Sequence, residues 1–451
     1  MRFIGSLTEI TQTVQGQLRG GGEITVSGIS TDSRLNDLSG TLFISLQGEK
    51  FNGHNFIYQA LEKGASAVLV EEFIESDIPQ IKVVNTCFAL GKIGSYWRKH
   101  FKIPIVAITG SNGKTTTKEM VSSILSKSNL SLSTQGNLNN QIGVPLTLLQ
   151  LNANHRFAVI EMGANHSGEI NYLSQLVCPQ IALITNAGSA HLSGFKDLNG
   201  VAQAKGEIFQ GVSSGGIGVL NRDDPYFFYW HRLAMRNGLR VISFGLGQSA
   251  MIYAADLTSN PEGTEFTLFT PKGTIRIPLP LLGTHNVVNA LAASAVAFTL
   301  GLKLDQIYEG LITFSPAFGR LQVKYTSSGA RILDDTYNGN PSSFQAALEV
   351  LAQFTGDRIL VLGDFAELGE KSIELHEDLG QQARSARINQ LYTLGNFSAA
   401  ASKSFGCGGK HFFDQQTLIV ELQKIKTRNT TILIKGSRFM NMEQIVTALC
   451  T

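Results

Sequence analysis

The chain has 451 residues, with 37 Lys and Arg against 35 Asp and Glu and a formal net charge of +2. A single hydrophobic core stops growing at about 250–300 residues, so this length predicts several domains. The balanced charge provides no global field that would attract nucleic acid or an anionic membrane. We expect neither as a partner, and any anionic ligand must be held locally.

The cysteines and the apolar runs indicate a reduced, cytoplasmic setting. Cys87, Cys178, Cys407 and Cys450 are far apart and form neither a C-x-x-C pair nor a zinc pattern. The amino terminus lacks the apolar run of a signal peptide, and no stretch approaches the roughly 18 apolar residues of a membrane span. We therefore expect a soluble protein of the cytoplasm.

The first segment, residues 1–84, mixes short strands with a helix. β-Rich runs occupy Thr41–Leu46 and Ala67–Val70, and a helical pattern covers Asn55–Lys63. This mixture predicts a small amino-terminal α/β domain.

The second segment, residues 85–314, opens with a β-loop-α unit. A helix is predicted over Cys87–His100 and a strand over Ile103–Thr109, followed by a glycine-rich loop. The helix after the loop carries one apolar face, formed by Met120, Val121, Ile124 and Leu125.

Runs typical of parallel strands buried on both faces follow in this segment and in the third, residues 315–451. They are Phe157–Gly163, Ile181–Gly188, Arg358–Asp364, Gln390–Gly395 and Thr430–Gly436. They predict an α/β protein whose central parallel-sheet domain is followed by a carboxy-terminal Rossmann-like domain.

The loop TGSNGKTTTKEM predicts a phosphate site. Gly110 and Gly113 allow successive N–H groups to face an anion at the start of the following helix. Lys114 adds a positive charge, and Thr115 supplies a hydroxyl suited to Mg²⁺, for which Thr116 could compete. An ordinary strand-to-helix turn is the alternative, but a buried strand before the loop and an amphipathic helix after it favour a nucleotide site.

Three further residues could complete a magnesium nucleotide site, because adjacent parallel strands present ligands at their carboxyl ends. Glu161 stands near a strand end and could bind metal directly; the alternative is a solvated loop acid. His191 lies just past the next predicted strand, although a lone histidine is more often structural. Lys205 lies on a predicted helix and by itself reads as a surface lysine.

The motifs, taken together, resemble the Mur ligase family. The resemblance is carried in order by TGSNGKTTTKEM, GNLNNQIGVPLTLL, EMGANHSGEI, NAGSAHLSGF, GTHNVVNALAA, FGRLQV, DDTYNGNPSS and LGDFAELGE, and more loosely by STDSR near the amino terminus. Four of them, GNLNNQIGVP, THNVVNA, DDTYNGNP and GDFAELG, are most similar to the members that add D-alanyl-D-alanine to UDP-N-acetylmuramoyl-tripeptide.

The resemblance implies ATP-driven amide formation on three domains, with the central P-loop domain as the ATPase. A carboxylate becomes an acyl phosphate by attacking the γ-phosphoryl group, and an amine then displaces phosphate. Thr115 and Glu161 would hold one Mg²⁺, and His191, alone or with Glu161, a second. Lys205 matches a lysine that is often carbamylated in the family, with a plain salt-bridging lysine as the alternative. Lys114, His191, Lys205 and Arg320 would be the catalytic residues.

The resemblance also assigns the ATP site to two domains. Asn289, with His285 and Asn286, matches the adenine-side motif, Arg320 an arginine that reaches the γ-phosphate, and Asp335 an acid that contacts the ribose. An ordinary linker arginine is the alternative for Arg320. The loop residues that would bind nucleotide are Gly110, Ser111, Asn112, Gly113, Lys114, Thr115 and Thr116. Closure of the carboxy-terminal domain would then exclude water from the acyl phosphate.

The substrate residues implied by the resemblance lie in three stretches. Ser30, Asp32, Ser33 and Arg34 match the segment that grips the UDP-sugar, and Arg34 suits a diphosphate. The amide-rich loop of Asn137, Asn139 and Asn140 and the turn of Tyr337, Asn338 and Asn340 could bind sugar or peptide, although asparagine also favours turns for conformational reasons alone. In that turn Gly339 replaces the commoner alanine, and we expect a small effect.

Three alternatives remain at this point. One is a sibling ligase that adds another amino acid, including the folylpolyglutamate synthetase type, which shares the ATP chemistry. Another is a P-loop kinase or switch, which gives no reason for a second α/β domain beginning at Arg320. The third is a noncatalytic scaffold, which the retained site residues disfavour. We expect a monomer that binds ATP, Mg²⁺, UDP-N-acetylmuramoyl-tripeptide and D-alanyl-D-alanine.

Overall fold

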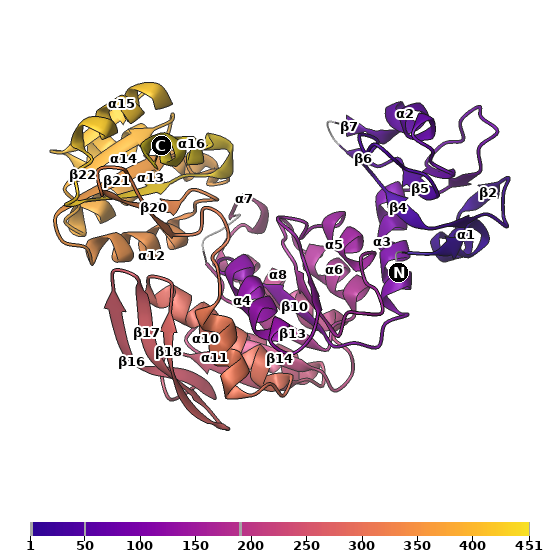
Figure 1. Ribbon diagram of the computed structural model, residues 1–451, viewed down its shortest axis with the longest axis horizontal. Coiled ribbons are helices and arrows are strands. Elements are labelled where there is room, and N and C mark those ends of the chain that lie inside the picture. The colour runs from indigo at the N-terminus through magenta and orange to yellow at the C-terminus, as the bar shows by residue number, and fades with distance from the viewer. Residues whose placement is uncertain (1–2, 49–50, 189–191, 451) are drawn as a thin grey trace.

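The computed structural model describes residues 3–48, 51–188 and 192–450. Three groups of α/β elements follow one another along the chain (Figure 1). Each is built on a mixed or mostly parallel sheet, so the predicted α/β class with three parts is confirmed. The ranges 1–84, 85–314 and 315–451 remain our proposal for the exact division into domains.

The amino-terminal group is built on a five-stranded sheet. Its strand order is β2 (Gln17–Arg19), β9 (Gln80–Lys82), β8 (Ala67–Val70), β5 (Thr41–Ile44) and β4 (Gly28–Ser30), with β2 antiparallel. The short strands β1 (Gly5–Ser6), β3 (Thr25–Val26), β6 (Gln47–Gly48) and β7 (Phe51–Asn52) form two further ribbons. The helices are α1 (Leu7–Val14) and α2 (Ile57–Glu62), the latter entered through a 3₁₀ turn, Gly53–Phe56.

The central group contains a nine-stranded sheet. Six parallel strands come first, in the order β11 (Ser131–Ser133), β12 (Phe157–Glu161), β10 (Ile105–Thr109), β13 (Ile181–Ile184), β14 (Ile217–Asn221) and β15 (Arg240–Gly245). Strand β16 (Ile252–Asn260) pairs parallel to β15 and then begins an antiparallel meander with β17 (Gly263–Thr270) and β18 (Gly273–Leu279). The sequence patterns predicted the parallel strands but not this meander.

Helices cover both faces of the central sheet (Figure 1). They are α3 (Thr86–Arg98), α4 (Lys114–Ser126), α5 (Gly143–Leu148), α6 (Glu169–Val177), α7 (Leu192–Phe195), α8 (Leu198–Gly206), α9 (Phe227–Arg236), α10 (Thr284–Thr299) and α11 (Leu304–Ile312). The four predicted apolar residues of α4 are all fully buried, as its amphipathic pattern requires.

The carboxy-terminal group is a six-stranded sheet in the order β19 (Gln322–Tyr325), β20 (Arg331–Asp335), β24 (Thr430–Lys435), β21 (Asp357–Gly363), β22 (Gln390–Leu394) and β23 (Gly409–Phe412). Only β19 is antiparallel among these strands. Its helices are α12 (Pro341–Ala352), α13 (Ser372–Ser385), α14 (Ser398–Phe405), α15 (Gln415–Ile425) and α16 (Glu443–Cys450). The predicted Rossmann-like arrangement is therefore confirmed.

The apolar core joins the first two groups but largely separates the third. One buried cluster runs without a break from Phe3 and Leu90 to Ile105 and Phe209. The two clusters of the carboxy-terminal group draw a single buried residue, Leu282, from the central elements described. The carboxy-terminal group therefore meets the rest of the molecule mainly through other contacts.

The four cysteines are all free thiols. Within the described ranges, none of the helices is both long enough and apolar enough to cross a bilayer.

Candidate active site

The glycine-rich loop joins the end of β10 to the start of α4, as predicted. Gly110 has φ +147° and Gly113 has φ +78°, a backbone region that favours glycine. A Cβ atom at Gly110 would lie 1.9 Å from Thr185 Oγ1, and one at Gly113 would lie 2.2 Å from Asn289 Oδ1. Both glycines are therefore required for the close approach of the loop to its neighbours.

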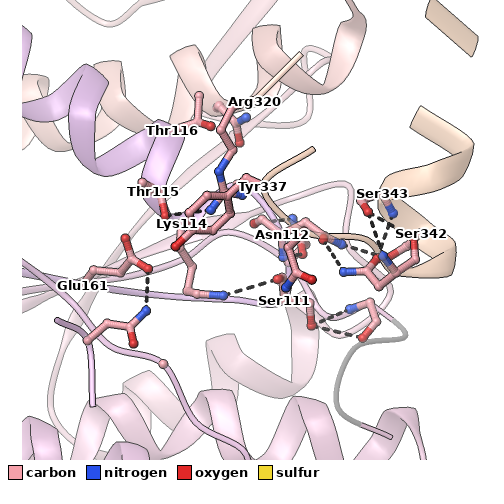
Figure 2. A pocket seen from close by; sticks show the side chains of 18 of the residues that line it. Ser111, Asn112, Lys114, Thr115, Thr116, Glu161, Arg320, Tyr337, Ser342 and Ser343 are labelled. Carbon is pink, nitrogen blue, oxygen red and sulfur yellow. Dashed lines mark hydrogen bonds between the residues drawn. The ribbon is translucent and has the colours of Figure 1, made fainter. Parts of the chain in front are cut away.

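Lys114 and Thr115, the first residues of α4, face an arginine from the carboxy-terminal group (Figure 2). Lys114 Nζ donates to the carbonyl oxygens of Gly110 at 2.7 Å and Ser111 at 3.3 Å. Arg320 Nη2 donates to Thr115 Oγ1 at 3.2 Å, and its guanidinium carbon lies 4.1 Å from the centre of the Tyr337 ring. Arg320 therefore reaches the phosphate loop.

The charges at this loop favour an anionic ligand. Burial lowers the pKa of Lys114, the nearby Glu161 opposes that change, and Arg320 adds to it. Two cations that destabilise one another are both stabilised when an anion lies between them. The N-terminal N–H groups of α4 add to this field.

Glu161 is the last residue of β12, only 2% exposed. Its main-chain N–H donates to Thr134 Oγ1 at 2.9 Å, and its Oε1 accepts a hydrogen bond from Asn139 Nδ2 at 2.8 Å. The second carboxylate oxygen, Oε2, is buried and finds no donor among the described residues. An unpaired buried carboxylate oxygen is costly, and a cation would satisfy it.

These residues line a cavity of about 760 Å³ between the central and carboxy-terminal groups. Of the residues predicted from the sequence, the cavity wall contains Ser111, Asn112, Gly113, Lys114, Thr115, Thr116, Asn137, Asn139, Asn140, Glu161, His285, Asn286, Asn289, Arg320, Asp335, Tyr337, Asn338 and Asn340. Gly110, also predicted, is not among the residues that line the cavity. The fold thus gathers residues from six separate stretches of sequence, 111–116, 137–140, 161, 285–289, 320 and 335–340, at one place.

The first turns of α10 supply His285, Asn286 and Asn289. Asn289 Nδ2 donates to Asn286 Oδ1 at 3.1 Å, and Asn286 Nδ2 donates to Leu282 O at 2.9 Å. Burial lowers the pKa of His285 to about 4, although Asp335 opposes the change. His285 is therefore neutral near pH 7 and offers a hydrogen bond without a charge.

Sequence reasoning missed Lys435, which also lines the cavity. Its side chain is 1% exposed, and its ammonium group pairs with Asp335 Oδ2 at 2.5 Å and donates to Asn338 O at 3.1 Å. Its position as the last residue of β24, in TTILIKG, was an available signal because carboxyl ends of parallel strands build ligand sites. Lys435 holds Asp335 at the cavity wall.

Two of the amide-rich stretches also have structural roles. Asn140 Oδ1 accepts hydrogen bonds from Ile142 N at 3.1 Å and Gly143 N at 2.9 Å, which fixes the start of α5. Asn340 is the N-cap of α12, and its side chain accepts from Ser343 N. Asn140 and Asn340 therefore have the conformational role that the sequence offered as an alternative to ligand binding.

Lys205 is not one of the described residues that line the cavity. Lys205 lies on α8 as predicted, yet it is 2% exposed, so the reading as a surface lysine is wrong. Burial lowers the pKa of Lys205 to about 7, with Lys114 contributing, and its ammonium group lies 5.3 Å from the centre of the Phe195 ring. His191 lies outside the described residues.

The STDSR stretch belongs to the amino-terminal group and does not contribute to the described cavity wall. Asp32 pairs with Arg34 at 2.8 Å, and hydrogen bonds from Arg34 lower the pKa of Asp32 to about 2. Ser33 Oγ donates to Gln59 Oε1 at 2.8 Å, and Ser30 Oγ accepts from Asp32 N at 3.2 Å. The Arg34 side chain is 86% exposed, so it is accessible to a ligand.

Within the described ranges, no three His, Cys, Asp or Glu side chains cluster to hold a metal by themselves. The donor set of the described residues is not an all-protein cage of acids and imidazoles. It fits Mg²⁺, which protein sites bind through one or two carboxylates together with water and substrate phosphates. Glu161 and the Thr115 hydroxyl are suitable oxygens.

Comparison with known proteins matches the chain along most of its length. Three family models match: the Mur ligase family catalytic domain at residues 25–93, the Mur ligase middle domain at 108–297 and the Mur ligase glutamate ligase domain at 319–438. The UDP-N-acetylmuramoyl-tripeptide–D-alanyl-D-alanine ligase of Escherichia coli K12 is 42% identical, with 98% of each chain covered.

Solved structures of MurF ligases also resemble the chain along nearly its whole length. A crystal structure of MurF from Acinetobacter baumannii has a TM-score of 0.94 and 36% identity, covering 100% of this chain and 99% of that one. MurF ligase from Thermotoga maritima in complex with ADP has a TM-score of 0.84 and 28% identity, covering 93% and 96%.

Proposed function

The chain belongs to the Mur ligase family, and we propose that it uses ATP to join D-alanyl-D-alanine to UDP-N-acetylmuramoyl-tripeptide. The product would be the pentapeptide precursor of peptidoglycan. The observation that carries the proposal is one cavity in which Lys114 and Thr115 face Glu161 and Arg320 from separate parts of the chain.

The reaction explains why these residue types are present. The terminal carboxylate of the tripeptide attacks the γ-phosphoryl group and releases ADP. The dipeptide amine then attacks the acyl phosphate, the carbon–oxygen bond to phosphate breaks, and a proton is lost as the amide forms. The first step brings two anions together, so fixed positive charges and N–H groups must be in place beforehand. Lys114, Arg320 and the start of α4 supply them.

Bound Mg²⁺ would neutralise charge on the phosphates, and Thr115 and Glu161 are the described residues that would hold it. The buried, unpaired Oε2 of Glu161 supports this role, because a cation would offset the cost of burying it. His191 stays our prediction for a second metal ligand. Thr116 is 8% exposed and sits one residue further into α4, so we favour Thr115 as the ligand.

The nucleoside end of ATP is assigned to the wall formed by α10 and β20. Neutral His285 and the bonded pair Asn286 and Asn289 offer polar groups for the adenine. Asp335, held by Lys435, would accept hydrogen bonds from the ribose. Arg320 would reach the γ-phosphate by leaving the Thr115 hydroxyl free for metal.

Lys205 is proposed to act as a carbamate. Only a neutral amine attacks carbon dioxide, and the lowered pKa of Lys205, about 7, makes the neutral form available at physiological pH. The carbamate would be an anion near the cavity that could orient the acyl phosphate or bind metal. A structural lysine that stacks on Phe195 is the competing role.

The acceptor substrate is proposed to extend from the cavity to the amino-terminal group. Asn137 and Asn139 would contact its peptide or sugar portion near the reaction centre, with Tyr337 and Asn338 on the opposite wall. Ser30, Asp32, Ser33 and Arg34 would hold the UDP end, and the exposed Arg34 is suited to the diphosphate. We further propose that the protein acts as a monomer in the cytoplasm.

A phosphate-release assay tests the proposal. Purified protein is supplied with ATP, Mg²⁺ and UDP-N-acetylmuramoyl-tripeptide, and D-alanyl-D-alanine, single amino acids or glutamate are added in turn. We expect turnover with the dipeptide alone. Turnover with a single amino acid or glutamate would indicate a sibling ligase, and phosphoryl transfer with no amide formed would indicate a kinase.

A further inference from the structure

Asn112, in the middle of the phosphate loop, directs its side chain toward the carboxy-terminal group. Its Nδ2 donates to Ser342 Oγ at 2.7 Å, and its Oδ1 accepts from Asn340 Nδ2 at 2.9 Å. Both partners stand at the start of α12, in the carboxy-terminal group, more than two hundred positions away in the sequence. Figure 2 shows Ser342 beside Asn112.

The three side chains form a closed ring of hydrogen bonds. Asn112 donates to Ser342, Ser342 Oγ donates to Asn340 Oδ1 at 2.9 Å, and Asn340 donates back to Asn112. Each group is donor to one neighbour and acceptor from the other, so the bonds polarise and strengthen one another. We call Asn112, Asn340 and Ser342 the amide ring.

The main chain of Asn112 is also fully occupied. Its N–H donates to Asn186 Oδ1 at 3.0 Å, and its carbonyl oxygen accepts from Thr185 Oγ1 at 2.6 Å and Asn186 Nδ2 at 3.1 Å. The main chain of Asn112, its Oδ1 and one N–H of its Nδ2 are therefore engaged in hydrogen bonds to neighbouring residues. The side-chain hydrogen bonds of Asn112 join the phosphate loop to the start of α12.

Two further observations support a role for the ring in linking the phosphate loop to the position of α12. A Cβ atom at Gly188 would lie 2.8 Å from Ser342 Oγ and 3.1 Å from Asn112 Nδ2, so the loop after β13 closes over the ring. The carboxy-terminal apolar clusters take only Leu282 from the central elements described, so few apolar contacts compete with the ring in setting the position of α12.

We propose that Asn112 and Ser342 are positioning residues that lock the first turn of α12 to the phosphate loop, so that nucleotide on the loop fixes the carboxy-terminal group over the cavity. The inference deepens the proposed function: the locked position keeps water from the acyl phosphate until the dipeptide amine attacks. An unlocked group admits water, which attacks the acyl phosphate and gives the free carboxylate, phosphate and a proton.

The test uses the full-length protein and three alanine variants. Asn112→Ala and Ser342→Ala each break the ring. Ser343→Ala is the matched control, because Ser343 lies in the same helical turn and its hydroxyl bonds the main chain of Asn340, so the change removes none of the three ring bonds. The ratio of phosphate released to dipeptide joined is measured for each protein.

Wild type and Ser343→Ala should release one phosphate per amide bond, whereas both ring variants should release at least about twice as much, because water competes for the acyl phosphate. Equal ratios and equal kcat in all four proteins would overturn the inference. If the wild type joins no dipeptide, the proposed function fails, and a second readout decides the inference.

That readout is hydrogen exchange in residues 338–352 with and without a non-hydrolysable ATP analogue. Analogue bound at the phosphate loop should slow exchange there in wild type and Ser343→Ala and leave it unchanged in Asn112→Ala and Ser342→Ala. The same protection in all four proteins, or none in wild type, would show that the ring does not couple the two segments.

Discussion

The ammonium group of Lys114 donates hydrogen bonds to two carbonyl oxygens of its own loop, those of Gly110 and Ser111. These bonds hold the side chain at the cavity wall without requiring any contact from the rest of the core. The proposed function assigns the charge of Lys114 to the phosphates of the bound nucleotide.

Replacing Lys114 with alanine should reduce kcat by about 10²–10³-fold or more, because a preorganised charge on the transferring phosphoryl group is lost. The thermal unfolding midpoint should stay close to that of the wild type. Lys127→Ala, an exposed change just after the same helix, is the control and should leave kcat unchanged. Wild-type turnover by Lys114→Ala would contradict the phosphate-loop assignment.

Gly339 matters more than its sequence position suggested. A small effect was expected at this departure from the family alanine, but a Cβ atom there would lie 2.2 Å from Cε1 of Phe365. Phe365 is 1% exposed and packs edge-on against Phe344, so the ring cannot easily move away. The glycine and the bulky Phe365 are a matched pair.

Gly339→Ala should therefore lower the free energy of unfolding by about 1–3 kcal/mol through overpacking. Combining it with Phe365→Leu should cost less than the sum of the two single changes, since the smaller side chain makes room. Denaturant unfolding of the four proteins measures this coupling. Additive costs would show that the two residues do not compete for the same space.

Lys205 should make stability depend on pH. Burial lowers its folded pKa to about 7 from the ordinary value of 10.5, so between these values the unfolded chain binds a proton that the folded chain does not. Stability contributed by Lys205 therefore rises as the pH increases from about 7 towards 10.

The comparison is between wild type and Lys205→Met, unfolded by urea in carbon dioxide-free buffer at pH 6.5 and 9.5. The wild type should gain about 2–3 kcal/mol relative to the variant over this range. Parallel pH profiles would mean that Lys205 is not held neutral in the fold.

At the scale of elements, helix α4 carries a second lysine, Lys118, which supports the cavity wall. Lys118 is 1% exposed and donates to the carbonyl oxygen of Thr134 at 2.6 Å. Thr134 Oγ1 in turn accepts the main-chain N–H of Glu161. Helix α4 thereby fixes the end of β11 and, through it, the end of β12, where Glu161 stands, the carboxylate that we propose binds Mg²⁺.

Lys118→Met keeps the volume but removes this support, so the Mg²⁺ concentration for half-maximal activity should rise about tenfold, the usual cost of losing an outer-shell contact to a metal ligand. Glu119→Gln is the control, since it removes the ion pair of Lys118 and keeps its bond to Thr134. An unchanged magnesium dependence in Lys118→Met would separate α4 from the metal site.

Local sequence patterns predicted some elements of the structure and missed others. Strands β10, β12 and β13 were predicted because apolar runs report burial on both faces, and the glycine spacing located the loop before α4. The meander β16–β18 was missed, because exposed residues along β16 interrupt any continuous apolar run. Lys435 and the amide ring were missed because their partners are far away in the sequence, where no local spacing can reveal them.

At the scale of the whole molecule, the cavity exists only where the central and carboxy-terminal groups meet. The amino-terminal group shares its apolar core with the central sheet, whereas the carboxy-terminal group has clusters of its own. The polar contacts that Arg320 and the amide ring make at the phosphate loop therefore help to set the position of the carboxy-terminal group. This arrangement suits an enzyme that must close over a water-sensitive intermediate.

The fate of oxygen from the acceptor carboxylate tests this account most directly. UDP-N-acetylmuramoyl-tripeptide labelled with ¹⁸O in both oxygens of its reacting carboxylate is incubated with the protein, ATP, Mg²⁺ and D-alanyl-D-alanine, and the products are weighed by mass spectrometry. Transfer through an acyl phosphate predicts one ¹⁸O in the released phosphate and one in the new amide. Pentapeptide formed alongside unlabelled phosphate, or labelled substrate left unchanged while ATP is consumed, would contradict it.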